Sequence, residues 1–330
     1  MAQPLLEVRG LSVEYRARDA TVYAVSGVSF ALQPGELLAI VGESGSGKST
    51  VGLAVPRLLP AEAAITAGAI TLGGTDLLAL PDAELRGYRG RRIAMIFQDP
   101  VAGLNPVIDI GSQVAEILTS HLDLGRKEAR RRAIDLLYRV GLAEPERIAR
   151  SYPFQLSGGM CQRVMIGIAT ALDPQLLIAD EPTSALDVTV QAQILYQLER
   201  LRAERGTAVL LVTHDFGVVA QVADRVAVMY AGRIVEEGPV RAILRSPLHP
   251  YSHGLLATLP RVDGVRAHLH QIPGSPPEMT APAARCPFLP RCGKALSRCR
   301  EAPPPSLEPA GDGDRRVACY NPIWQGAPAD

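Results

Sequence analysis

The stretch GESGSGKST, residues 42–50, constrains the fold of this chain more than any other feature of its sequence. It fits the phosphate-loop pattern G-x-x-x-x-G-K-[ST], and the apolar run LLAIV before it has the composition of a buried strand. A glycine- and serine-rich turn between a strand and a helix is the plain alternative. Lysine and serine at the two required positions favour the phosphate loop, and with it an α/β fold of the P-loop type.

Each residue type in this loop has a physical role. Glycines let successive backbone N–H groups point at one anion, and the helix that follows adds the positive end of its dipole. Lys48 would reach the outer phosphates of a nucleoside triphosphate, and the Ser49 hydroxyl would ligate Mg²⁺. We expect the nucleotide-binding residues to be Gly42, Glu43, Ser44, Gly45, Ser46, Gly47, Lys48, Ser49 and Thr50.

Short apolar runs recur along the chain and predict strands. They are residues 5–8, 37–41, 93–97, 176–179, 208–212 and 225–230. Helical patterns lie between several of these runs. This alternation predicts an α/β core with a parallel sheet, whose loops meet a ligand at one edge.

Two regions depart from this alternation. Residues 25–32 and 70–72 indicate a small antiparallel sheet. Further along, the strand signal stops and residues 110–119 and 127–140 have helical patterns. We therefore expect a helical subdomain at about residues 100–165, inserted into the α/β core.

Length and charge bound the possible partners. The chain has 330 residues, enough for about two domains, and its 34 basic residues balance its 34 acidic ones. The chain therefore has no net positive charge that would attract it to nucleic acid or to an anionic membrane. We find neither a signal peptide nor a run near the ~20 apolar residues of a membrane span. We expect a soluble chain on the cytoplasmic side, whose membrane contacts go through a partner.

The apolar run 176–179 ends in two carboxylates, Asp180 and Glu181. Asp180 would hold Mg²⁺ through its water shell, and Glu181 would orient and deprotonate an attacking water in ATP hydrolysis. A strand that merely ends in acidic turn residues is the alternative for an isolated pair. The phosphate loop in the same chain favours the catalytic interpretation.

Four further motifs follow in a recognisable order. Gln98 follows a predicted strand, LSGG occupies residues 156–159, SALD occupies 184–187, and His214 follows another predicted strand. Together they resemble the ATP-binding cassette (ABC) ATPases. The resemblance implies an ABC nucleotide-binding domain at residues 1–245, with a parallel-sheet core, an antiparallel β subdomain and an inserted helical subdomain.

The LSGG motif is the most specific of these features. The Ser157 hydroxyl and the N–H groups of Gly158 and Gly159 at a helix start would form a second anion site. The resemblance implies that this site caps the ATP of an opposing cassette, so that two subunits lie head to tail around two ATPs. A P-loop kinase would leave the motif unexplained.

The resemblance assigns the remaining motif residues. Gln98 would sense the γ-phosphate and Mg²⁺ and contribute to both metal binding and catalysis. Asp187 would lie at the interface between cassettes, and His214 would contact the γ-phosphate and the attacking water. Tyr15 is our candidate for stacking on adenine and Tyr23 the second choice, because any base offers a π face to an aromatic ring.

The chain from about residue 248 is rich in proline and holds four of the five cysteines: Cys286, Cys292, Cys299 and Cys319. In a reducing compartment such a set indicates a metal site rather than disulfides. An all-thiolate site suits a [4Fe–4S] cluster or Zn²⁺, and unmetallated thiols are the third alternative. Cys161, where the cassette family commonly has a polar or basic residue, fits a buried small side chain without chemistry.

The segment at residues 246–330 resembles the C-terminal extension of cassettes that serve oligopeptide, dipeptide and nickel importers. Its matching stretches are LHPY at 248–251, IPGSP at 272–276 and CPFLPRC at 286–292. In some members the cysteines hold a [4Fe–4S] cluster. Such a cluster would cross-link a C-terminal segment that has too few apolar side chains to fold unaided.

The resemblance implies an ATP-hydrolysing subunit, peripheral at the cytoplasmic face of the membrane. Its partners would be a second cassette, identical or related, two transmembrane permease subunits and, indirectly, an extracytoplasmic solute-binding protein. The solute would be a peptide or a related small molecule such as a nickel chelate. The alternative is a soluble ABC ATPase acting on ribosomes or nucleic acid, which the single motif set and the balanced charge disfavour.

Overall fold

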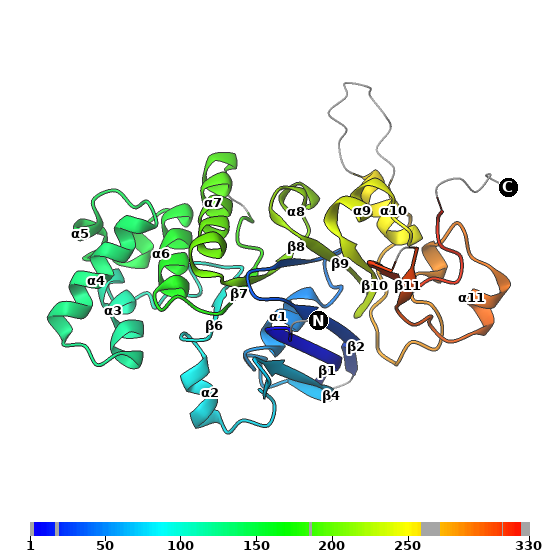
Figure 1. The fold of residues 1–330 in the computed structure, drawn as a ribbon, viewed down its shortest axis with the longest axis horizontal. Helices are drawn as coiled ribbons and strands as arrows, with labels where there is room; N and C mark the ends of the chain where they lie inside the picture. The colour runs from blue at the N-terminus through cyan, green and yellow to red at the C-terminus, as the bar shows by residue number, and fades with distance from the viewer. Residues whose placement is uncertain (1–2, 17–19, 185–186, 259–270, 312, 325–330) are drawn as a thin grey trace. The chain divides into compact units, whose positions relative to one another are not determined.

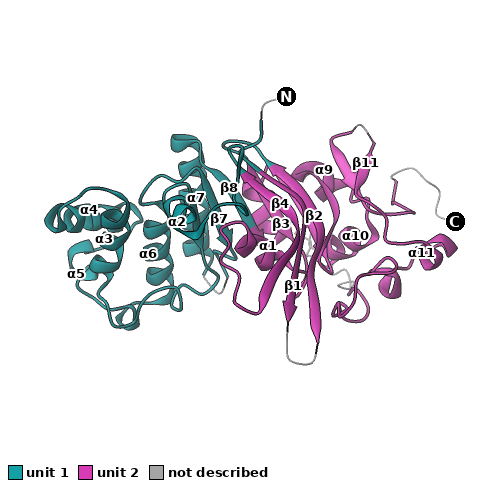
Figure 2. Ribbon diagram, turned by 90° about the horizontal axis from the view of Figure 1, so that it is seen from below, with its two compact units in different colours: residues 1–6, 32–36, 72–211 teal, residues 7–31, 37–71, 212–330 magenta. Residues whose placement is uncertain are grey.

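The computed structural model describes residues 3–16, 20–184, 187–258, 271–311 and 313–324. Its contacts divide the chain into two compact units (Figure 2). Unit 1 comprises residues 1–6, 32–36 and 72–211. Unit 2 comprises residues 7–31, 37–71 and 212–330. Each unit is therefore built from segments that are far apart in the sequence.

Three strands of unit 1, β6 (Ile93–Ile96), β7 (Leu176–Asp180) and β8 (Ala208–Thr213), are buried along their whole length. β6 pairs in parallel with β7, so that Ile93 faces Leu176 and Ile96 faces Ala179. β8, most of which belongs to this unit, lies next to β7. Continuous apolar runs are typical of parallel strands covered on both faces, which is why the sequence pattern located all three.

A group of helices follows β6 in unit 1 (Figure 1). They are α3 (Ile110–His121), α4 (Arg126–Arg139), α5 (Pro145–Ile148), the 3₁₀ turn η1 (Pro153–Gln155) and α6 (Gly158–Thr170). α4 turns Ala129, Ala133 and Leu137 inward, at the spacing of one helical face. The unit also contains β5 (Thr75–Asp76), α2 (Asp82–Tyr88) and α7 (Val188–Arg205). The helices expected at 110–119 and 127–140 are thus present, with bounds differing by one or two residues.

Unit 2 contains a sheet in which β3 (Leu37–Val41) and β9 (Arg225–Tyr230) are parallel, with Val41 opposite Val228. β10 (Arg233–Pro239) pairs antiparallel with β9. β12 (Arg315–Val317) and β11 (Glu308–Ala310) then extend the sheet beyond β10, both antiparallel. The helices α8 (Phe216–Val222), α9 (Val240–Arg245) and α10 (Pro250–Ala257) belong to the same unit.

A second sheet of unit 2 has the order β2, β1, β4. These strands are β1 (Leu6–Arg16), β2 (Thr21–Leu32) and β4 (Ala63–Leu72). The Gly10 N–H donates to Ser29 Oγ and the Gly27 N–H to Ser12 Oγ, so β1 and β2 run in opposite directions. The run at 5–8, which we grouped with the parallel core, therefore belongs to the antiparallel sheet. Burial alternates along β1, as expected of a strand with one solvated face.

The described part of the proline-rich extension is short in regular structure. Besides β11 and β12, it forms the 3₁₀ turn η2 (Leu289–Arg291) and the short helix α11 (Ser297–Glu301). Val317 packs with Leu248 and Ala310 in a small buried cluster. The extension is stabilised by adding strands to the sheet of unit 2, which is how a segment with little apolar mass becomes ordered. No helix in the described part of the chain has the length and apolarity of a membrane span.

Candidate nucleotide-binding site

The phosphate loop follows the carboxyl end of β3 and runs into α1 (Lys48–Ala54). A Cβ atom on Gly42 would lie 2.1 Å from the Met229 carbonyl oxygen, and one on Gly47 would lie 2.3 Å from that of Ala24. Gly47 also has φ +97°, a backbone conformation that side chains disfavour. Both glycines of the motif are therefore required by close packing of the loop against neighbouring backbone.

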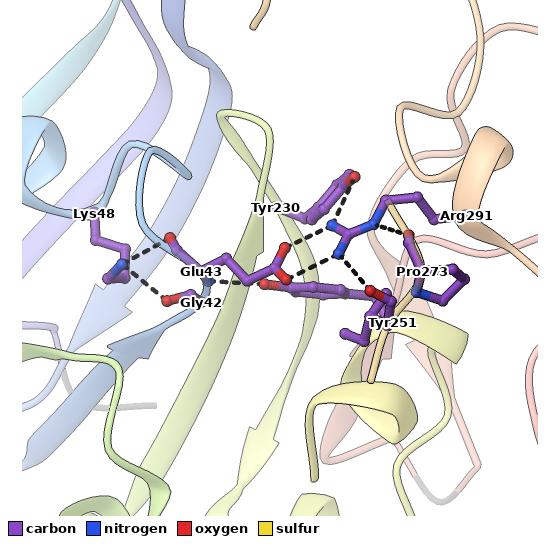
Figure 3. A network of polar contacts seen from close by, with 8 residues as sticks. Gly42, Glu43, Lys48, Tyr230, Tyr251, Pro273 and Arg291 are labelled. Carbon is purple, nitrogen blue, oxygen red and sulfur yellow. Dashed lines mark hydrogen bonds and ion pairs between the residues drawn. The ribbon is translucent and has the colours of Figure 1, made fainter. Parts of the chain in front are cut away.

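Lys48 is buried within the loop. Its Nζ donates to the carbonyl oxygens of Gly42, at 2.9 Å, and Glu43, at 3.0 Å (Figure 3). The Ser46 hydroxyl oxygen is buried and has no hydrogen-bond partner among the described residues. A buried ammonium and an unsatisfied hydroxyl on one glycine-rich loop fit a phosphate ligand, since buried polar groups normally have partners.

The two tyrosines proposed for adenine differ in position. The Tyr15 hydroxyl lies 3.2 Å from Thr50 Oγ1, so Tyr15 contacts the last residue of the phosphate loop. The Tyr23 backbone N–H donates to the Met279 carbonyl at 2.7 Å. Both rings are half-buried. Of the two, Tyr15 is thus the one whose hydroxyl contacts the phosphate loop.

In unit 1, the parallel pairing brings Gln98 and the two carboxylates to the same sheet edge. Gln98 comes two residues after the end of β6 and is exposed, and Asp180 is the buried last residue of β7. Glu181 follows with φ +46°, which is uncommon for a residue other than glycine. Strained backbone of this kind gathers at functional sites, and here it sets the direction of the predicted catalytic carboxylate.

Two helix starts of unit 1 carry the other motif residues. The Ser157 hydroxyl caps α6 by accepting from the Met160 N–H at 3.4 Å, and both Ser157 and Gly158 are exposed. Gly159 is half-buried. Asp187 is exposed and caps α7, accepting from the Val190 N–H at 2.9 Å. Residues 185 and 186 of the SALD motif lie outside the described residues.

His214 belongs to unit 2, where it follows β8 and is exposed. The structure thus groups the predicted site residues in two sets. The phosphate loop, Tyr15 and His214 are in unit 2, whereas Gln98, Asp180 and Glu181 are in unit 1 together with Ser157–Gly159 and Asp187.

The four cysteines of the extension line one pocket, together with His249, Phe288 and Tyr320 among others. All are free thiols. Burial, with the neighbouring cysteines as a smaller cause, raises the pKa of Cys286 and raises that of Cys319 to about 11. Within the described ranges, no three His, Cys, Asp or Glu side chains form an arrangement that could hold a metal ion.

Cys161 is fully buried on α6, and its Sγ lies 3.6 Å from the Pro153 carbonyl oxygen. Burial raises the pKa of its thiol. These observations agree with the prediction of a small buried side chain. Arg291 and Tyr251, by contrast, contact the phosphate loop, and sequence reasoning missed both. Both lie in stretches that resemble the importer extension, LHPY and CPFLPRC, but those stretches give neither residue a role, and Arg291 is 248 positions from its partner in the loop.

The chain matches two family models. Residues 25–184 match the family described as ABC transporter, and residues 235–299 match the C-terminal region of oligopeptide/dipeptide transporters. Among solved structures, the dimeric structure of a bacterial ABC transporter cassette is similar, with a TM-score of 0.65 and 32% identity. The match covers 72% of this chain and 99% of that one. The expected ABC cassette fold is confirmed.

Two relatives extend the match to nearly the whole chain. The oligopeptide transport ATP-binding protein OppD of Salmonella typhimurium is 46% identical over 322 residues, which are 98% of this chain and 95% of the relative. OppD of Mycobacterium tuberculosis is 49% identical over 318 residues, or 96% of this chain. The chain spans about half the length of that mycobacterial protein, of which 52% is covered. The chain therefore belongs to the family of ABC transporter ATP-binding proteins.

Proposed function

We propose that this chain is the ATP-hydrolysing subunit of an importer for oligopeptides, dipeptides or a related small solute such as a nickel chelate. The observation that carries the proposal is the phosphate loop itself, with its buried lysine and its unsatisfied serine hydroxyl. The near full-length similarity to the Salmonella oligopeptide transport ATP-binding protein supports the substrate class. ATP and Mg²⁺ are the cofactors that this chemistry requires.

The roles of the residues follow from their chemistry. Lys48 and the loop N–H groups would bind the β- and γ-phosphates, while the Ser49 hydroxyl and Asp180 would hold Mg²⁺. When bound, Mg²⁺ would neutralise charge on the phosphates. Glu181 would take the proton of the attacking water. Gln98 and His214 would orient that water against the γ-phosphate, and Tyr15 would stack on adenine.

The assembly is part of the proposal. Ser157 and Gly158 are exposed at the start of α6. Their backbone N–H groups could donate hydrogen bonds to the phosphates of an ATP bound by an opposing cassette. We infer a head-to-tail pair with an identical or related cassette, an inference supported by the dimeric state of the similar bacterial cassette. Asp187 would lie at this interface. Two permease subunits and an extracytoplasmic solute-binding protein would complete the importer at the cytoplasmic face of the membrane.

We also propose two functional parts of the chain, a cassette at residues 1–245 and an extension at 246–330. In the extension, Cys286, Cys292, Cys299 and Cys319 would ligate a [4Fe–4S] cluster, with Zn²⁺ as the alternative. The support for such a group is that all four thiols line one pocket, where Cys299 is buried and the other three are half-buried, although as they lie among the described residues they form no arrangement that could hold a metal ion. The pKa of Cys286 and that of Cys319 are raised by burial, so these thiols stay protonated unless a cation compensates their charge. The bound cluster would supply cross-links between segments of the extension, not redox chemistry.

The nucleotide assignment is tested by equilibrium titration of the full-length protein with a fluorescent ATP analogue and Mg²⁺. Lys48→Ala should lose binding, because the phosphates lose their main cationic partner. The matched control is Lys127→Ala, since Lys127 is exposed on α4. Undiminished binding by Lys48→Ala would remove the phosphate loop from the proposal. Copurification with permease proteins supports the importer, and copurification with nucleic acid the alternative.

The cysteine site is tested by metal analysis and an absorbance spectrum of anaerobically purified protein. A [4Fe–4S] cluster predicts iron, sulfide and a broad visible band, all lost in Cys299→Ala and kept in Cys161→Ala, since Cys161 lies outside the pocket. Stoichiometric zinc without colour would favour the alternative metal. Metal-free protein with normal stability would exclude both.

A further inference from the structure

Arg291 of the extension forms a two-bond ion pair with Glu43, the second residue of the phosphate loop (Figure 3). Arg291 Nη1 lies 2.6 Å from Glu43 Oε2, and Nη2 lies 3.0 Å from Oε1. The Arg291 side chain is 5% exposed and the Glu43 side chain 24% exposed. Both residues belong to unit 2. Parallel hydrogen bonds of this kind fix the orientation of both groups, not only their separation.

The remaining donors of Arg291 are also engaged. Nε donates to the Pro273 carbonyl at 2.9 Å, Nη2 approaches the Ile272 carbonyl at 3.4 Å, and Nη1 approaches the Tyr230 hydroxyl at 3.4 Å. The hydrogen bond with Glu43 is the main cause that raises the pKa of Arg291, so the guanidinium stays charged. A guanidinium held on every side has one orientation, which makes it a fixed anchor for the loop.

The backbone of Glu43 is held from both sides as well. Its N–H donates to the Tyr251 hydroxyl at 2.8 Å, and its carbonyl accepts from Lys48 at 3.0 Å. Figure 3 shows Glu43 between Lys48 on one side and Arg291 on the other. The N–H group, the carbonyl and the carboxylate of this one residue therefore all have partners. Two of those partners, Tyr251 and Arg291, come from the extension.

Aromatic rings pack closely around Tyr251 and Arg291. The rings of Tyr230 and Tyr251 have centroids 4.6 Å apart, and Phe288 packs against them at 5.3 and 5.5 Å. Tyr251 is fully buried, and burial raises its pKa, so its hydroxyl remains neutral. Phe288 directly precedes the η2 turn, and Arg291 is the last residue of that turn. Closely packed aromatic rings of this kind tolerate little displacement.

Resting on the proposed function, we propose that Arg291 is a positioning residue for the triphosphate. It neutralises the Glu43 carboxylate and holds it on the side of the loop away from Lys48. Without Arg291, an uncompensated carboxylate would stand on the second residue of a loop that binds a polyanion, and the repulsion would grow with the number of phosphates. The extension thereby sets the affinity of the cassette for ATP.

The test is a double-mutant cycle in the full chain, with MgATP and MgADP affinities measured by titration of fluorescent analogues. Arg291→Met should weaken MgATP binding about tenfold and MgADP binding less. Measured against Glu43→Gln as the third corner of the cycle, Arg291→Met/Glu43→Gln should bind more tightly than Arg291→Met and recover most of the loss, because the carboxylate is gone. Arg291→Lys should recover only part, since an ammonium makes no two-bond pair. Arg300→Met, at an exposed position of α11, is the control.

The outcomes separate this inference from the proposed function. A double variant as weak as Arg291→Met, or equal losses for ATP and ADP, would mean that Arg291 only supports the fold, and would overturn the inference. Unchanged MgATP affinity in Arg291→Met, beside lost binding in Lys48→Ala, would overturn it too and leave the proposed function intact. Failure of the wild-type protein to bind MgATP would instead overturn the proposed function.

Discussion

At the scale of single residues, the phosphate loop depends on two different properties of glycine. Gly45 and Gly47 both have positive φ, +78° and +97°, which disfavours any side chain. They differ in surroundings. Nothing lies within 4 Å of a Cβ atom on Gly45, whereas one on Gly47 would meet the Ala24 carbonyl at 2.3 Å. Substituting Gly45 therefore tests backbone strain alone, whereas substituting Gly47 tests strain together with a steric clash.

We predict that Gly45→Ala costs only the strain of its backbone conformation, about 1–2 kcal/mol of unfolding free energy. Gly47→Ala should cost more and should also abolish MgATP binding, because the loop must move away from Ala24. Thermal unfolding with and without MgATP measures both effects. Equal behaviour of the two variants would contradict the role of close packing at Gly47.

Sequence alone could predict the parts of the site that lie within one short segment. The spacing of Gly42, Gly47 and Lys48 is local, so the loop was recognisable without a structure. The contact between Glu43 and Arg291 joins positions 248 residues apart, and no periodicity encodes it. The cap that Asp187 makes on α7 was likewise not predicted, because the sequence offers the same residue for a cap and for the interface role that the resemblance implies.

At the scale of secondary structure, β10 is the element that sequence reasoning missed for a clear physical reason. Its sequence RIVEEGP contains two adjacent glutamates, which argue against a buried strand. Yet Glu236 and Glu237 are buried. Glu236 pairs with Arg315 at 2.8 Å, and Glu237 pairs with Arg225 and Arg316. Buried charges are tolerated because arginines, two of them from β12, compensate them.

We predict that Arg315→Met destabilises the protein by about 3–5 kcal/mol, because the buried Glu236 carboxylate then keeps no cationic partner among the described residues, only the Leu248 and His249 N–H groups. Adding Glu236→Gln should recover part of the loss. Arg241→Met, at an exposed position of α9, is the control and should change little. Urea unfolding provides the free energies. A double variant no more stable than Arg315→Met would argue against a charge effect.

At the scale of the whole molecule, the proposed head-to-tail pair predicts that two cassettes associate when ATP is bound and not hydrolysed. Glu181→Gln should bind MgATP but not hydrolyse it, since the water lacks its base, and should therefore accumulate as an ATP-bound pair. The wild-type protein should return to single cassettes as ATP is consumed. Light scattering coupled to size-exclusion chromatography, with MgATP in the buffer, distinguishes these states.

A second variant, in the LSGG motif, tests whether pairing uses this motif. Ser157 would cap only the partner's ATP, so Ser157→Arg in the Glu181→Gln background should abolish pairing while leaving MgATP binding by each cassette's own loop unchanged. Ser120→Arg, at an exposed position of α3, should leave the pair intact. Loss of both pairing and nucleotide binding in the Ser157 variant would place this residue in its own chain's site. A Glu181→Gln protein that stays solitary with bound MgATP, both in solution and in its membrane assembly, would refute the two-cassette mechanism.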